Sequence, residues 1–404
     1  MSKLPLTGIR IIDLSHSWAA PHCSRILADF GAEVIKVEYP RRLCILRGAK
    51  KINRNYDSQP AWHQVNRNKL GITLDLKVAG DRDAFVDLVK ISDVVVENSR
   101  TMVSDCLGFG YSDLTKLKKD IIMVSMSAFG HSGPFSNFVG YGAVFEAVSG
   151  IQSLTAYKVG EKPQRIREMD VTNGIAGAGA VMTALIHRQM TGQGQHIDIS
   201  QLETATHAAI GEHLLEYAAN GTQIGPTGNR HRYYAPQGCY QCRGNDKWVV
   251  ITVRTKQEWQ RLCQVMEHPE WITDSRFIDS NSRHIHHDIL DRFIEEWTSQ
   301  RNHYEVMHIL QGAFIPAGAV LDLQELKKDP HLRARKYFRE ETTGSSRTFM
   351  GVPFRLSGTV GLPLNRGPDL GGDNEYVSRE ILGHEENEGI IRNDSEIGTA
   401  YDPE

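Results

Sequence analysis

GIRIIDLSHSWAAPHCSRILADFGAEVIKVE, residues 8–38, is the stretch that decides the fold. It begins with an apolar, strand-like run at 8–15, and the loop 16–22 leads into a helical stretch at 23–30. A second strand-like run follows at 33–38. Strand, helix and strand in this order form a βαβ unit, in which the strands are parallel and the crossover is right-handed.

The same alternation continues along the chain. Further strand-like runs lie at 71–77, 93–98 and 121–127, and helical segments separate them at 81–90 and 112–119. This order predicts an α/β fold with a Rossmann-like parallel sheet. The first strand-to-helix turn lacks the G-x-G-x-x-G glycines that cradle a pyrophosphate, so a dinucleotide-dependent oxidoreductase is not favoured.

Length and composition predict two domains. The chain has 404 residues, of which 40% are apolar, and single cores stop growing near roughly 250 to 300 residues. Around 221–238 the composition changes to Gly, Pro and Arg, which is typical of a boundary. We therefore expect a large domain at 1–220, a small α+β domain at 221–322, and a linker with a C-terminal return to the large domain at 323–404.

The overall charge excludes several classes of partner. A net charge of -3 provides no basic field, so we expect neither nucleic acid nor a membrane surface as a partner. No run resembles a membrane span or a signal peptide, which favours a cytoplasmic protein. The six cysteines are scattered, and the pair Cys239 and Cys242 has no second pair nearby, so we expect neither a disulfide framework nor a metal site.

Asp170 is the most informative acidic residue. It lies in IREMDVTNGIAGAGAVMTALIHRQMTGQGQ, residues 166–195, just before a mostly apolar helix expected at 174–190. Aspartate is among the best N-cap residues, so one hypothesis is that Asp170 caps this helix. The other is that its carboxylate does chemistry, and spacing alone favours the cap.

The chain resembles the family III CoA transferases, the formyl-CoA and carnitine CoA transferase group, over residues 6–360. The segments that carry the resemblance occur in the family's order: LTGIRIIDLSHSWAAPHCSRILADFGAEVIKVE, NRNKLGITLDLK, DVVVEN with LGFGYSDL, SAFGHSGP, DVTNGIAGAGAVMTALIHRQMTGQGQHIDIS and GNRHRYYAPQGCYQC. The resemblance implies a large domain built from both chain ends, a smaller inserted domain, and two ring-shaped chains interlocked as a dimer.

The resemblance also implies an activity. Such enzymes move CoA from an acyl-CoA to a free carboxylic acid, and Asp170 matches the family's nucleophile. The carboxylate attacks the thioester to give an aspartyl anhydride, and CoA then forms an aspartyl-CoA thioester. The CoA thioester is a substrate, and no tightly bound cofactor is expected. We expect an organic acid as the second substrate and succinyl-CoA as the donor, as in the succinyl-CoA:benzylsuccinate branch.

The CoA-binding prediction combines the resemblance with position in the fold. Loops at the carboxyl ends of parallel strands commonly bind ligands, although a lone histidine is more often structural. Arg100 is expected to replace an arginine that the family often has where Cys106 stands. The predicted set is His16, Trp18, Ala19, Arg41, Arg42, Leu74, Asp75, Leu76, Lys77, Asn98, Arg100 and Tyr141.

A basic segment at 41–69 suits the phosphates of CoA. It contains a single acid, Asp57, and the alternative is a solvated basic face. Its cations are Arg41, Arg42, Arg47, Lys50, Lys51, Arg54, Arg67 and Lys69.

The organic acid is expected at GNRHRYYAPQG, which suits a dicarboxylic or aryl-substituted acid because it combines cations with aromatic rings. The residues are Arg230, His231, Tyr233 and Tyr234.

Two alternatives remain open. An α-methylacyl-CoA racemase would place a histidine at Tyr141 and an aspartate at Gly142, and a tyrosine with pKa near 10 is a poor base at pH 7. The chain could also be one subunit of a heteromer formed with a related chain.

Overall fold

The computed structural model describes residues 4–48, 56–341, 347–359, 362 and 364–384. Lys50, Lys51 and Arg54 of the basic segment lie outside the described residues. The chain forms two compact units. The large unit comprises 1–152, 165–222 and 336–404, and the second unit comprises 153–164 and 223–335.

These units differ in two places from the division expected from sequence. Residues 153–164 precede the compositional boundary, yet they belong to the second unit. Residues 323–335, which we had assigned to the returning segment, also belong to the second unit. The large unit is built from both ends of the chain.

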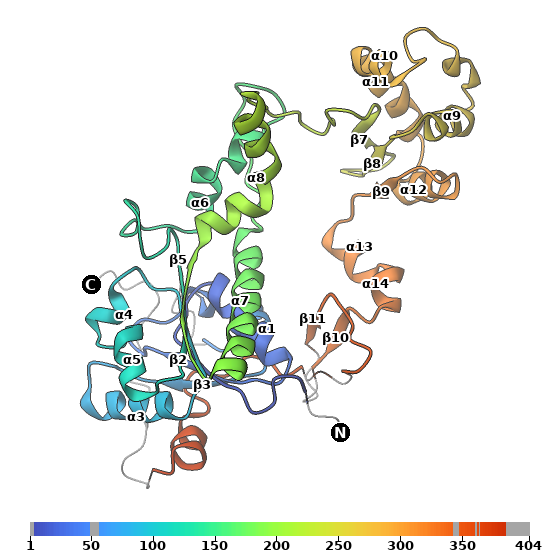
Figure 1. Ribbon diagram of the computed structural model, residues 1–404. Helices are drawn as coiled ribbons and strands as arrows, with labels where there is room; N and C mark the ends of the chain where they lie inside the picture. Colours follow the sequence, from blue (N-terminus) through green and yellow to red (C-terminus); the bar gives the residue numbers. More distant parts are fainter. Residues whose placement is uncertain (1–3, 49–55, 342–346, 360–361, 363, 385–404) are drawn as a thin grey trace. The chain divides into compact units, whose positions relative to one another are not determined.

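A six-stranded sheet forms the centre of the large unit (Figure 1). Its order is β3-β2-β1-β4-β5-β6 and every pair is parallel, as in doubly wound α/β proteins. The parallel sheet predicted from the sequence is confirmed. The strands are β1 (Arg10–Asp13), β2 (Glu33–Glu38), β3 (Lys69–Thr73), β4 (Val94–Glu97), β5 (Ile122–Ser127) and β6 (His196–Ser200).

The strand expected at 71–77 was wrong beyond Thr73. Leu74 and Asp75 instead begin the turn into the next helix, where the Asp75 carboxylate accepts a hydrogen bond from the backbone N–H of Lys77 at 3.1 Å. An aspartate that bonds backbone two residues onward favours a turn over a strand ladder.

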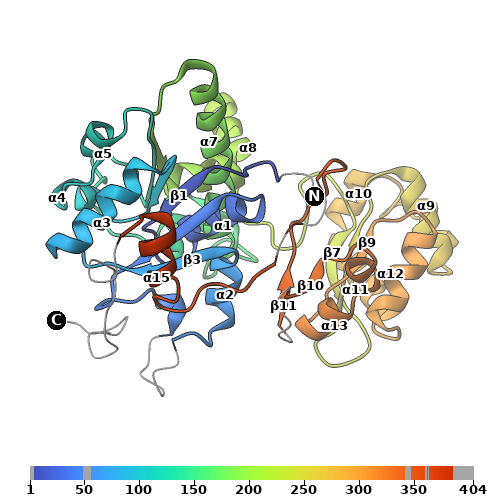
Figure 2. The same ribbon diagram turned by 90° about the horizontal axis from the view of Figure 1, so that it is seen from below.

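Helices lie on both faces of the sheet (Figure 2), and alternating side chains of the strands pack against these two layers. Ile11 and Val94 pack with helices α1 and α7, whereas Ile12 and Val95 pack with α3 and α5. Both faces of the sheet are thus buried, as parallel sheets require. The main helices of the large unit are α1 (Ala19–Asp29), α2 (Pro60–Asn66), α3 (Ala79–Lys90), α4 (Val103–Cys106), α5 (Tyr111–Leu117), α6 (Gly142–Val148), α7 (Met169–Thr191) and α8 (Gln201–Asn220).

Glycines allow α7 to lie directly against α1. A Cβ atom at Gly174 would stand 2.8 Å from the carbonyl oxygen of Ala19, and one at Gly177 would stand 3.1 Å from Sγ of Cys23. Small residues let two helix backbones approach closely. The contact brings the first turns of α1 and α7 together, and with them the loop after β1 and Asp170.

Part of α7 is apolar and exposed. By length and composition α7 is apolar enough to cross a membrane, a criterion that the core helices of globular proteins also meet. Packing on α1 explains one apolar face of this helix, and an exposed stripe remains on another. The stripe consists of Val171, Ile175, Met182, Ile186 and Met190.

The C-terminal segment returns to the sheet edge at β3. The backbone N–H of Gly71 donates to Asp373 at 2.7 Å, and the N–H of Asp373 donates to the carbonyl of Gly71 at 3.0 Å. Trp62 donates its indole N–H to the carbonyl of Pro368 at 2.9 Å. The remaining elements here are η1 (Ile45–Arg47), η2 (Ile151–Leu154), β10 (Phe338–Glu340), β11 (Thr348–Met350), α15 (Asn374–Tyr376) and η4 (Val377–Ile381).

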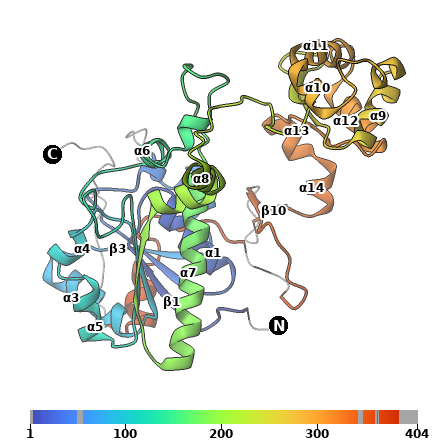
Figure 3. The same cartoon turned by 45° about the horizontal axis from the view of Figure 1, so that its top comes forward.

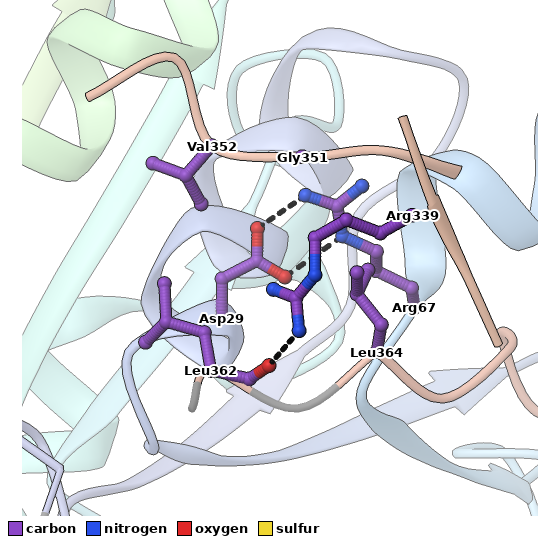
Figure 4. Close-up of a pocket in the computed structure, with 7 residues that line it drawn as sticks. All are labelled: Asp29, Arg67, Arg339, Gly351, Val352, Leu362 and Leu364. Carbon is purple, nitrogen blue, oxygen red and sulfur yellow. Dashed lines mark hydrogen bonds and ion pairs between the residues drawn. The ribbon is translucent and has the colours of Figure 1, made fainter. Parts of the chain in front are cut away.

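A small pocket lies where this returning segment meets α1 (Figure 4). Asp29 accepts two hydrogen bonds from Arg67 across it, at 2.8 and 2.6 Å, and Arg339 donates to the carbonyl of Leu362 at 2.9 Å. The charged side chains that line the pocket are thus bonded within the protein, Asp29 to Arg67 and Arg339 to the carbonyl of Leu362. Of the residues expected to meet CoA or the organic acid, only Arg67 of the basic segment lines this pocket, and its side chain is bonded to Asp29.

The second unit has its own three-stranded antiparallel sheet, labelled in Figure 1, and its own core. The helices of this unit are labelled in Figure 3. A capping box starts α9: Thr255 accepts from the N–H of Glu258, whose carboxylate accepts from the N–H of Thr255. The elements are β7 (Gln237–Gln241), β8 (Trp248–Thr252), α9 (Lys256–Val265), η3 (Pro269–Ile272), α10 (Ser280–Ile285), α11 (His287–Thr298), α12 (His303–Gly312), β9 (Ala317–Ala319), α13 (Leu323–Lys328) and α14 (Pro330–Ala334).

Candidate active site

The loops after β1 and β4 meet at the point where the strand order reverses. The backbone N–H of His16 donates to Oδ1 of Asn98 at 2.7 Å, and Nδ2 of Asn98 donates to the carbonyl of His16 at 2.8 Å. The structure thus brings together two predicted residues that are far apart in sequence. In open α/β sheets this crevice is the usual place for a ligand.

The loop after β1 is held in an unusual conformation. Ser17 has φ of 63°, in the left-handed region that non-glycine residues rarely adopt. Trp18 takes the N-cap position of α1, and Ala19 is its first residue and is buried. Backbone held in such a region is frequent at ligand sites.

His16 is neutral at physiological pH. Burial lowers the pKa of His16 to about 4, with further lowering by the positive charges of Lys36 and Arg42. It is therefore suited to hydrogen bonding in its neutral form. Because its charge lowers the pKa of His16, the exposed Arg42 lies near the His16 ring.

Beneath this loop lies a buried charge cluster. Asp13 binds Lys36 at 3.1 Å and Lys69 at 2.8 Å, and Ser24 donates to Asp13 at 2.6 Å. All four side chains are buried. The two lysines hold the pKa of Asp13 well below its usual range, against the opposing effect of burial. The cluster fixes the end of β1 from which the loop departs.

The basic segment divides into two groups. Arg41 and Arg42 are exposed. Arg47 is buried and bonded to Glu38 at 2.9 Å, and Arg67 is buried against Asp29. Arg47, Arg67 and Lys69 are therefore structural ion-pair partners, because their donors are already engaged inside the protein. Only part of the predicted basic patch is accessible.

The turn after β3 offers few free side chains. Leu74 is packed in the core with Phe85, and the buried Asp75 bonds its own turn. Leu76 is half-buried and Lys77 is exposed. Any contact with CoA here would fall to backbone groups and to Lys77. Arg100 is exposed, close to Asn98 in sequence.

Asp170 lies inside α7, in its first turn. The N-cap position belongs to Glu168, and no side-chain cap bond is present there. The capping role proposed from sequence is therefore wrong, because the helix starts before Asp170. Burial raises the pKa of Asp170; Arg165 opposes this effect and Glu146 adds to it.

Two elements approach the Asp170 carboxylate. A Cβ atom added at Gly142, the first residue of α6, would stand 3.1 Å from Oδ2 of Asp170 and 3.3 Å from Nη2 of Arg165. Only glycine leaves this space open. Tyr141, immediately before it, occupies the N-cap position of α6 and is 66% exposed.

Comparisons with known proteins identify the family of this chain. The family model described as CoA-transferase family III matches residues 6–374. The chain belongs to CoA-transferase family III. As a member, it is a CoA-transferase, an enzyme of a class whose substrates are CoA thioesters.

Curated relatives of this CoA-transferase cover most of its length. It is 34% identical to the acetyl-CoA:oxalate CoA-transferase of Acetobacter aceti, over 82% of this chain and 85% of the relative. It is 32% identical to the succinyl-CoA--D-citramalate CoA-transferase of Chloroflexus aurantiacus, over 94% of each. A solved CAIB/BAIF family protein from Brucella suis has a TM-score of 0.85 and 27% identity, covering 94% of this chain and 100% of that one.

The residues predicted to bind the organic acid belong to the second unit of this CoA-transferase. Arg230 forms ion pairs with Asp288 and Asp291. The rings of His231 and Tyr234 stack, with centroids 4.2 Å apart. Arg230 therefore has a structural role in joining its loop to α11. Tyr233 is exposed.

Sequence reasoning missed Glu146 and Arg165. Glu146 is a single acid in an apolar stretch, GAVFEAV, and this was a usable signal because buried acids are rarely found without a partner. Arg165 gave no comparable signal. Among the described residues, no group of His, Cys, Asp and Glu side chains is arranged to hold a metal ion.

Proposed function

We propose that this enzyme moves CoA from an acyl-CoA to a dicarboxylic acid through covalent intermediates on Asp170. The observation that carries the proposal is that the Asp170 carboxylate is poorly solvated. It is partly buried, its pKa is raised by burial, and among the described residues no hydrogen bond to it is found. A poorly solvated carboxylate is a reactive nucleophile.

The chemistry needs no proton transfer. An oxygen of Asp170 attacks the thioester carbonyl, the C–S bond breaks, and an anhydride and CoA thiolate form. The thiolate then attacks the aspartyl carbonyl and releases the first acid, leaving an aspartyl-CoA thioester. The second acid attacks this thioester and expels the thiolate, which takes the new acyl group and frees the Asp170 carboxylate.

The acceptor class is supported by the relatives. Their names specify oxalate and D-citramalate, both dicarboxylic acids. An aryl-substituted dicarboxylic acid, as in the benzylsuccinate branch, falls within the same class. Purified protein should be incubated with succinyl-CoA or acetyl-CoA and a panel of mono- and dicarboxylic acids. New dicarboxylic CoA esters in the mass spectrum would support the proposal, and their absence with every donor would contradict it.

A racemase function is less well supported. It would need an acid and a base at Tyr141 and Gly142. Gly142 has no side chain, and a Cβ there would press on Asp170 and Arg165. The side chain of Tyr141 is exposed and is a weak base at neutral pH.

We predict that Arg41 and Arg42 bind phosphates of CoA. Replacing both with glutamate should raise KM for the acyl-CoA at least about tenfold, because two charge-assisted contacts become repulsive. The salt dependence of KM should also weaken. Exchanging Lys116 and Lys119, a different pair of exposed cations, for glutamate is the control. If both pairs changed KM equally, the two arginines would act only through the general charge of the surface and not by binding phosphates.

We also predict a dimer, either of identical chains or with a related chain. A stripe of exposed apolar side chains such as the one on α7 is the kind of surface that marks a protein–protein interface. If the two chains interlock, they cannot separate without unfolding. Mass photometry at nanomolar concentration should give twice the mass of one chain. Single chains that retain CoA transfer would contradict the dimer.

A further inference from the structure

Arg165 and Glu146 form an ion pair beside the nucleophile. Nε of Arg165 bonds Oε2 of Glu146 at 3.2 Å, and Nη2 bonds Oε1 at 3.4 Å. Both Oδ2 of Asp170 and Nη2 of Arg165 lie within 3.3 Å of the position that a Cβ of Gly142 would take. The guanidinium and the reacting carboxylate therefore border the same small space.

The two partners of this pair differ sharply in exposure. The side chain of Glu146 is 1% exposed, whereas that of Arg165 is 42% exposed. Glu146 bonds one edge of the guanidinium, and among the described residues no acceptor is found for Nη1. A planar guanidinium held along one edge presents its remaining donors in a fixed direction. The accessible edge is suited to bind a second carboxylate.

The charge balance around Arg165 changes during the reaction. In the resting enzyme one cation, Arg165, faces two anions, Asp170 and Glu146. When Asp170 becomes an anhydride or thioester it loses its charge, and Arg165 keeps only Glu146. An incoming anion then meets one fewer negative charge, so binding of an acid is favoured when the covalent intermediate is ready for it.

We propose that Arg165 binds the non-reacting carboxylate of the acceptor acid and selects dicarboxylic acids, and that Glu146 positions Arg165. The inference rests on the proposed function and deepens it. With one carboxylate bound to Arg165, the other carboxylate of a short acid reaches the aspartyl carbonyl. A monocarboxylic acid lacks this anchor.

The test compares acceptors in the variant Arg165→Gln. KM for a dicarboxylic acceptor should rise about 10- to 100-fold, as expected for loss of a hydrogen-bonded charge pair. KM for a monocarboxylic acid of the same chain length should change less than about threefold. The control is Arg167→Gln, since Arg167 is an exposed arginine of the same segment. It should leave both constants unchanged.

A second readout separates recognition from support of the fold. Formation of the covalent adduct from acyl-CoA alone reports Asp170 without any acceptor. The acid limb of its pH profile should move to higher pH in Arg165→Gln and to lower pH in Glu146→Gln, because Arg165 lowers and Glu146 raises the pKa of Asp170. Adduct formation with these opposite shifts would show that both variants fold and that the pair lies beside Asp170, so a selective loss for dicarboxylic acceptors would then report recognition; unchanged profiles in both variants would contradict the placement of the pair.

The possible results separate the role of Arg165 from the proposed function. Equal losses for mono- and dicarboxylic acceptors, or equal losses in Arg167→Gln, would overturn the role of Arg165. If Arg165→Gln does not fold, Arg165→Lys is the replacement variant. It keeps the positive charge but lacks the paired N–H donors of the guanidinium, so it should still show a selective loss for dicarboxylic acids. Absence of adduct and transfer in the unmodified enzyme would instead reject the proposed function.

Discussion

Replacement of Asp170 with asparagine is expected to lower CoA transfer by several orders of magnitude and leave the protein at least as stable as before. The amide cannot act as an anionic nucleophile, so the covalent route is lost. Transfer should be measured by mass spectrometry of CoA esters. In the unmodified enzyme, acyl-CoA with hydroxylamine should convert Asp170 to a hydroxamate on the peptide containing EMDVTNG.

The stability part of this prediction follows from the raised pKa of Asp170. Burial makes ionisation of the Asp170 carboxyl group more costly in the folded state than in the unfolded state. Asparagine removes that cost. The advantage of the variant should therefore appear as pH rises through the folded-state pKa, and it should vanish below the unfolded value, near about 3.9.

Urea unfolding of both proteins between acidic and neutral pH measures this difference, and intact mass must show that the asparagine has not deamidated. Glu168→Gln, at the N-cap of the same helix, is the matched control and should retain transfer. A folded Asp170→Asn variant with near-normal turnover would reject the mechanism.

The largest loss of stability is expected from Asp13→Asn. This change leaves Lys36 and Lys69 buried without their carboxylate. Breaking a buried ion pair by removing one partner costs about 3 to 5 kcal/mol, because an uncompensated charge remains inside the protein. Urea unfolding at neutral pH would report the loss as a lower midpoint.

The control is Asp113→Asn, which breaks an exposed pair with Lys116 at 2.8 Å and should cost less than about 1 kcal/mol. The pKa of Asp13 lies well below its usual range, so its contribution is present above the unfolded pKa and disappears as pH falls toward the folded one. A loss below about 1 kcal/mol for Asp13→Asn would show that the cluster does not stabilise the fold.

Local sequence patterns determined several elements with their bounds. The strand at 33–38 forms where the apolar pattern predicted it, and the helices expected at 81–90 and 112–119 form within two residues of those bounds. Capping is equally local: α8 begins after Ser200, whose hydroxyl accepts from the N–H of Glu203. These elements were predictable because strand periodicity and helix capping depend on residues a few positions apart.

The division of the basic segment could not be predicted in this way. Arg47 and Arg67 look like Arg41 and Arg42 in sequence, yet the first two are buried in ion pairs. Their partners, Glu38 and Asp29, come from a neighbouring strand and from a helix. Whether an arginine meets a ligand or a carboxylate depends on which elements pack beside it.

The sequence by itself determined the family, the parallel α/β architecture and the candidacy of Asp170, because motif order and hydrophobic periodicity are properties of the chain. Only the tertiary structure placed Asp170 within a helix and brought Glu146 and Arg165 to its side. Burial and charge partners decide how a carboxylate ionises, and both arise from contacts between segments that the linear sequence keeps apart.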